Sequence, residues 1–404
     1  MENSRVLRCT NVVLLLTGYQ IYWFDIKSQR FVLSLPGAVN IFVLGCVYAG
    51  CFSQHFNPKS SLLNLLHDVS PFLFGLTRMQ LLLGVKALAY AVYSSFKAIG
   101  AINSLVESLP RNNNGISKDE VIAYAMLTST FGVLSCFGFY IAFEMKFELP
   151  PLQDAMIGVA LFMPHWILAG SVRLYTILAW LTRGQMEHLQ KNIEEVLSAN
   201  LTKEEPNLAS TSFTVSASNT SLDYLESLRR RLEILGARFN YIFKALQHSL
   251  IFLFGLNFNC LLGGIYSFIY YRNTWHVLFE DRKQRIFYAA NASIYACIAC
   301  DYICLLFVQF MMENKRLSFV KSLDMTLSPR SALPKKMRSF VKDIKVILSK
   351  KFQSKFHSIW RFDITHFSLL VFLQMIIIAL VVVFLYLNDE INLLRDELNS
   401  KDDE

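Results

Sequence analysis

Of the ionisable side chains inside the long apolar stretches of this sequence, five are the ones we consider most able to do chemistry there. They are Arg78, Lys86, His165, Arg173 and Asp301. A charge that faces lipid is costly, so each is expected to face protein or a water-filled cavity. Asp301 and Lys86 fall near the middle of their stretches. This placement predicts a structural ion pair between Asp301 and either Lys86 or Arg173.

A second group of side chains predicts a cavity that binds a small molecule. Arg78 and His165 fall in the outer half of their stretches, and Pro164 frees backbone groups that a cavity can use. Aromatic residues complete such a site, since ligand cavities combine apolar walls with a few polar groups. The predicted ligand-binding residues are Arg78, His165, Trp166, Tyr266 and Tyr295.

No pattern typical of an enzyme occurs in the sequence. It has no nucleophile elbow, no glycine-rich phosphate loop and no His/Glu pair at metal-binding spacing. Cys297, Cys300 and Cys304 would line one face of a helix, but as metal ligands they would have to lose protons inside lipid. We interpret them as packing residues. We therefore expect a non-enzyme with no catalytic residue, metal or cofactor.

Seven apolar runs must position these side chains, and each reaches the roughly 20 residues that a membrane-spanning helix needs. They predict an all-α membrane protein with one domain over 1–390. An acidic tail follows at 391–404. The predicted spans are about 31–56, 70–96, 121–145, 155–182, 245–271, 286–312 and 364–388.

Basic residues are distributed unevenly among the segments between the runs. The alternate segments that begin with the amino terminus hold 28 of the 39 Lys and Arg residues, and the other segments hold 8. The positive-inside rule then predicts a cytoplasmic amino terminus and an extracellular carboxyl terminus. Orientation and anionic membrane lipid explain the net charge of +8, so no nucleic-acid partner is expected.

The long loops carry further helical patterns. Apolar residues at helical spacing in 182–197 and 222–245 predict two cytoplasmic extensions, separated by a flexible insertion at about 205–221. An amphipathic helix at 336–352 lies either on the membrane surface or between subunits. The segment 11–24 is too short for a standard span, so we expect an interfacial or tucked helix there, with an eighth span as the alternative.

The inverted orientation excludes a G-protein-coupled receptor and resembles that of the insect gustatory receptors. An aromatic segment ending at Asp25, with Arg30 and then Ser34 before the first span, resembles the entry of that family. The long helical extensions also resemble the family. Near the end, the segment 362–365 with Leu369 and Leu370 is similar to the family's entry into the last span.

The family's sharpest motif, Thr-Tyr, five apolar residues and Gln-Phe in the last span, is altered. One register begins at Ile378 and ends at Tyr386, and an alternative register puts the Gln on Gln374. With the first register, the resemblance implies a stripe of residues that line and gate a pore. That stripe is Ile378, Val381, Val382 and Leu385.

The resemblance implies a taste receptor that is a ligand-gated, non-selective cation channel in the plasma membrane of sensory neurons. The expected partners are a small-molecule tastant, membrane lipid and other family members in a homo- or heterotetramer. Few hydroxyl or amide groups fall at the predicted cavity, which favours a bitter or other non-sugar ligand. The altered motif also keeps open a non-conducting co-subunit or scaffold.

Overall fold

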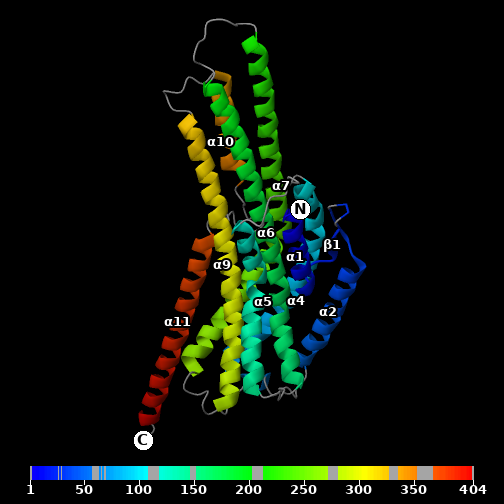
Figure 1. Cartoon of the computed structure of the whole chain (residues 1–404). Helices are drawn as coiled ribbons and strands as arrows, with labels where there is room; N and C mark the ends of the chain where they lie inside the picture. The colour runs from blue at the N-terminus through cyan, green and yellow to red at the C-terminus, as the bar shows by residue number, and fades with distance from the viewer. Residues whose placement is uncertain are drawn as a thin grey trace.

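The computed structural model describes residues 2–25, 27–28, 30–56, 63–64, 66–67, 70–107, 118–145, 152–202, 213–271, 281–326, 335–352 and 367–402. Nearly all of them are helical (Figure 1). In chain order the elements are α1 (Glu2–Leu16), β1 (Tyr22–Asp25), β2 (Arg30–Leu33), α2 (Leu35–Ser53), the short helix η1 (Gln54–Phe56), α4 (Pro71–Glu107), α5 (Lys118–Met145), α6 (Leu152–Thr202), α7 (Phe213–Tyr271), α9 (Asp281–Thr326), α10 (Lys335–Lys351) and α11 (Phe367–Asp402).

Seven helices within these described ranges are long and apolar enough to cross a membrane. The prediction of an all-α chain with seven helices of membrane-spanning length is confirmed, whereas the membrane itself and the orientation stay predictions. The apolar segments are Leu35–Phe56, Pro71–Glu107, Val121–Glu144, Leu152–Ala199, Asp223–Ile269, Asn291–Thr326 and Val371–Asn388.

Helix α6 forms the centre of the bundle, because it packs against α2, α4, α5, α7 and α9. Pro164 lies inside this helix, where it removes one backbone hydrogen bond. The ring of Pro164 packs on Gly84 of α4, so closely that a Cβ atom at Gly84 would lie 2.8 Å from Pro164 Cγ. The missing side chain at Gly84 therefore brings α4 against the part of α6 that carries His165.

At one end of the bundle, α6, α7 and α9 continue well beyond the other helices (Figure 1). Helix α10 packs here on α7 and α9. The apolar face of α10 is buried against these helices of the same chain. The helix therefore needs neither a membrane surface nor a second subunit to bury this face, which were the two positions predicted for it. The face comprises Met337, Phe340, Val341, Ile344, Ile347 and Leu348. Helix α7 begins at Phe213, which corrects the flexible insertion predicted for 205–221, of which 203–212 lie outside the described residues.

The amino-terminal segment differs from its prediction. Helix α1 ends at Leu16, and the chain turns at Gly18, whose φ of 70° favours glycine. The antiparallel strands β1 and β2 follow, so 11–24 is not one helix and the first span begins at Leu35 rather than at residue 31. The Asp25 carboxylate accepts hydrogen bonds from the backbone N–H groups of Lys27 and Ser28, which closes the turn.

The hairpin is fixed to α4 by Asn103. The side chain of Asn103 donates to the backbone oxygen of Phe31 at 2.9 Å and accepts from its N–H at 2.7 Å. Asn103 thus pairs with β2 as another strand would. The aromatic and acidic segment before the first span is therefore a hairpin seated on the end of α4.

Candidate functional site

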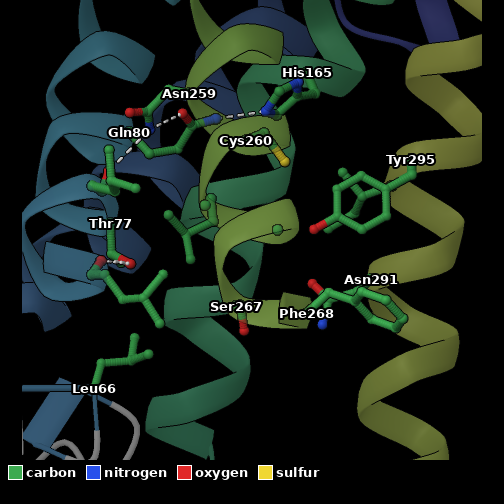
Figure 2. Close-up of a pocket in the computed structure, with 16 residues that line it drawn as sticks. Leu66, Thr77, Gln80, His165, Asn259, Cys260, Ser267, Phe268, Asn291 and Tyr295 are labelled. Carbon is green, nitrogen blue, oxygen red and sulfur yellow. Dashed lines mark hydrogen bonds between the residues drawn. The ribbon is translucent and has the colours of Figure 1, made fainter. Parts of the chain in front are cut away.

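A cavity of about 240 Å³ lies among α4, α6, α7 and α9. Leucine, isoleucine and phenylalanine contribute six of its 16 lining residues, and seven others carry an amide, imidazole or hydroxyl group (Figure 2). The expectation of few hydroxyl and amide groups at the cavity is therefore corrected. None of the residues that the structure places around this cavity is Asp, Glu, Lys or Arg. The cavity is therefore suited to a small uncharged molecule.

Three polar side chains from three helices form the inner end of the cavity. Gln80 of α4 contacts His165 of α6, with 2.6 Å between Nε2 of each residue. Asn259 of α7 donates to Gln80 Oε1 at 2.7 Å and to the backbone oxygen of Leu76 at 3.0 Å. In the view of Figure 2 the inner end of the cavity is at the top, so these bonds lie above the apolar walls. We call Gln80, His165 and Asn259 the polar floor.

The partners of His165 determine its protonation. The Gln80 amide nitrogen can only donate, so His165 Nε2 must accept from it. The other ring nitrogen, Nδ1, lies 2.9 Å from the side-chain oxygen of Asn257 and must donate to it. His165 is therefore a neutral imidazole with its proton on Nδ1. Every nitrogen of the floor is thereby engaged within the protein.

Tyr295 of α9 forms the opposite wall, and its hydroxyl points across the cavity toward α7 (Figure 2). It lies against Gly264, where a Cβ atom would be only 1.6 Å from the hydroxyl oxygen. No side chain in the described part of the protein bonds this hydroxyl. Tyr295 therefore presents a hydrogen-bonding group that the protein leaves unused.

The cavity opens toward the end of the bundle at which α7 ends and α9 begins. Leu66, Phe268 and Asn291 line it at this end (Figure 2). The Phe268 side chain is 59% exposed, whereas His165 at the floor is 8% exposed. A ligand would thus enter past Phe268 and stop at the polar floor.

The structure brings together only part of the predicted ligand site. His165 and Tyr295 line the cavity. Trp166 lines a neighbouring cavity of about 10 Å³, room for roughly one water molecule. Arg78 is turned outward over the ring of Phe74, 4.3 Å from its centre. Arg78 and Trp166 are therefore corrected as lining residues of the larger cavity.

Tyr266, the fifth predicted ligand residue, also lies outside the cavity lining. It packs instead with Ile378 and Val382 of α11. Sequence reasoning missed Gln80 and Asn259, because it looked for charges and aromatic rings within the apolar runs. Neutral amides in the same runs are the signal that would have found both.

The predicted intramembrane ion pair forms between Arg173 of α6 and Asp301 of α9. Arg173 Nη2 lies 2.9 Å from Asp301 Oδ1, and both side chains are almost fully buried. Arg173 also donates to the hydroxyl of Thr130 in α5. Lys86 is exposed and lies outside this pair. The ion pair and the bond to Thr130 therefore join α5, α6 and α9, which is the structural role predicted for the pair.

Polar contacts continue from the floor to the last helix. Asn257, the partner of His165, also lies near the Tyr302 side chain of α9, although its amide nitrogen has no hydrogen-bond partner among the described residues. The Tyr302 hydroxyl donates to Oε1 of Gln374 in α11 at 3.0 Å. Gln374 is 7% exposed within the apolar part of α11. Polar side chains thus continue from the floor to α11, with hydrogen bonds at the two ends of the series, His165–Asn257 and Tyr302–Gln374.

The orientation of α11 corrects the predicted pore stripe. Ile378 and Val382 are 0% and 3% exposed, because they pack on Leu73 of α4 and Leu262 of α7. Val381 and Leu385 pack partly against the same cluster. The whole predicted stripe therefore faces its own subunit. The opposite face is exposed, and it comprises Phe372, Leu373, Ile376, Ile377, Leu380, Val383, Phe384 and Leu387; we call it the outer face of α11.

Among the described residues, no group of three or more His, Cys, Asp or Glu side chains is placed to hold a metal ion. The sequence matches no protein-family model and no curated protein.

Proposed function

We propose that this chain is a subunit of a ligand-gated, non-selective cation channel of the gustatory-receptor type, which detects a small non-sugar molecule. The observation that carries the proposal is the series of neighbouring polar side chains from the polar floor to α11, in which His165 is bonded to Asn257 and Tyr302 is bonded to Gln374. A ligand at the floor can act on α11 through these groups. The seven apolar helices support placement in a membrane.

In this proposal, ligand binding shifts the chain between two arrangements of the polar groups. A ligand changes such an equilibrium only if it binds one arrangement better than the other. A ligand seated on the floor would favour one set of hydrogen bonds around His165, and Tyr302 would transmit that preference to Gln374. Helix α11 would then move relative to α7, on which it packs.

The outer face of α11 is the surface we assign to the pore in a homo- or heterotetramer. Its exposed residues between Phe372 and Phe384 are all apolar. A narrow apolar ring closes a pore by excluding water, and widening admits water and ions. The orientation predicted from the basic loops would put the cavity mouth outside the cell, where a tastant arrives at the plasma membrane of a sensory neuron.

A second candidate function is a co-subunit or scaffold that does not conduct. The observation that favours it is the same apolar outer face. Gln374, the amide inside the apolar part of α11, is turned into the bundle and bonded to Tyr302. A subunit whose exposed residues between Phe372 and Phe384 are all apolar would modify a channel formed with other family members rather than conduct by itself.

Electrophysiology separates the two candidates. The chain is expressed in heterologous cells alone and together with other family members, and whole-cell current is recorded during application of neutral small molecules. Inward cation current from the chain alone supports the channel. Current that requires a second subunit and changes its ligand response when this chain is present supports the co-subunit. No effect in either case contradicts both candidates.

A further inference from the structure

The chemistry of the cavity narrows the class of its ligand, an inference that rests on the proposed receptor function. The volume of about 240 Å³ limits the size. An apolar protein cavity of about 150 Å³ holds benzene, so this one accommodates a single ring with one or two small substituents. A disaccharide or a long lipid chain would not fit within it.

The wall restricts the charge of the ligand. No acidic side chain, lysine or arginine lines the cavity within the described residues. Arg78, the nearest candidate from the sequence, is directed over Phe74 and away from the cavity. An ion in such a site would lose its hydration without gaining an opposite charge. The ligand is therefore neutral.

The floor leaves a ligand one free acceptor, the side-chain oxygen of Asn259, which has no hydrogen-bond partner among the described residues. The nitrogens of Gln80, His165 and Asn259 are all engaged with protein partners. The Tyr295 hydroxyl is not, and it points across the cavity (Figure 2). A hydroxyl both donates and accepts, so it can bond a ligand hydroxyl or carbonyl.

Gly264 holds the Tyr295 hydroxyl in this position. Besides the 1.6 Å approach to the oxygen, a Cβ atom here would lie 2.3 Å from Cζ of the ring. A tyrosine ring is rigid, so an alanine at 264 would force the ring away from α7. Gly255, nine residues earlier in α7, has open space where its Cβ would be and provides a matched control.

We infer that the cavity binds a neutral single-ring molecule with one hydrogen-bonding group, which pairs with the hydroxyl of Tyr295 where Gly264 holds it. Tyr295 is then a residue that determines ligand specificity. The ligand is of the phenol or aromatic alcohol class, with its ring among the leucines of the wall.

Calorimetry on the purified full chain in nanodiscs tests this with 4-methylphenol and 1,4-dimethylbenzene. These two probes have nearly the same shape, and only the first carries a hydroxyl. The ratio of their affinities is compared between wild type and Tyr295→Phe, so that partition of each probe into lipid cancels. Loss of one hydrogen bond from a buried site should lower this ratio about five- to tenfold.

Gly264→Ala should weaken the binding of both probes, and Gly255→Ala should change the binding of neither. An unchanged ratio in Tyr295→Phe, or no binding of either probe to the wild type, would overturn the inference. The receptor proposal fails separately. If Tyr295→Phe lowers the affinity ratio but no current is recorded, alone or with other family members, the inference is supported and the receptor proposal is contradicted. If the ligand evokes current but the ratio is unchanged in Tyr295→Phe, the receptor proposal is supported and the inference is contradicted.

Discussion

The Tyr302 hydroxyl of α9 donates a hydrogen bond to Gln374 Oε1 of α11 at 3.0 Å. It is a polar contact in the packing between the last helix and the rest of the bundle. Because Tyr302 also lies near Asn257, the partner of His165, the bond ends a series of polar side chains that begins beside the cavity. It is the contact through which the account couples binding to α11.

Tyr302→Phe removes this hydrogen bond and keeps the aromatic packing. A neutral hydrogen bond contributes about 0.5–1.5 kcal/mol, so the ligand concentration for half-maximal current should shift by roughly two- to tenfold. Binding to the purified protein should change less than twofold. Patch-clamp recording and calorimetry measure the two quantities.

Tyr140→Phe is the control for this substitution, since Tyr140 is 43% exposed on α5. It should leave both current and binding unchanged. If Tyr302→Phe altered neither the response nor the maximal current, the route through Gln374 would be excluded.

Substitution of one partner in the buried ion pair should destabilise the fold strongly. Arg173→Ala leaves Asp301 with no counter-charge at 4% exposure, which costs about 3–5 kcal/mol. The melting temperature in detergent should fall by several degrees. A double substitution of Arg173 and Asp301 by leucine should recover much of the loss, because no buried charge then remains.

Lys86→Ala serves as the matched control for the ion pair, because Lys86 is exposed. Its melting temperature should match that of the wild type within about a degree. If Lys86→Ala and Arg173→Ala lowered the melting temperature equally, the ion pair would have no special role in stability.

Several of these relationships follow from the sequence and others do not. The apolar runs predicted the helices, since the length needed to cross a membrane is fixed by its thickness. Asp301 and Arg173 were predictable as neighbours for the same reason, because buried charges need partners. The choice of Arg173 over Lys86 depends on which way each helix face turns, and a pattern of apolar residues around the whole helix does not specify that.

The rotation of α11 could not be predicted for this reason. Its apolar residues surround the helix, so the spacing of Ile378 and Leu385 was equally compatible with a pore or with the core. Gln374 was the informative residue, since a buried amide must find a partner. The hairpin of β1 and β2 was missed because its aromatic residues are also compatible with a helix, while Gly18 and Asn103 determine its geometry.

Cysteine substitutions distinguish the two faces of α11. Leu380 is 64% exposed on the outer face and Ile378 is fully buried. In a background without reactive cysteines, a small thiol reagent should reduce current through Leu380→Cys by more than half and leave Ile378→Cys unaffected. If the reagent reduced current only in Ile378→Cys, the pore would be lined by the stripe predicted from the sequence and not by the outer face.

Helix α10 should depend on its inner face. Ile344 is 0% exposed where α10 packs on α7 and α9, so Ile344→Asp buries an unpaired charge and should lower the melting temperature markedly. Lys342 is exposed on the same helix, and Lys342→Ala should have little effect. Thermal unfolding followed by intrinsic fluorescence compares them. If both variants melted like the wild type, α10 would not be held by this packing.

The most direct test of the central claim is single-channel recording of the purified full chain in a planar bilayer. The 4-methylphenol probe is added to the side on which the cavity opens. Cation-selective openings should begin on addition, cease on washout, and be absent with Gly264→Ala but present with Gly255→Ala. A silent bilayer, with protein from the same preparation binding 4-methylphenol in the cavity, would contradict it.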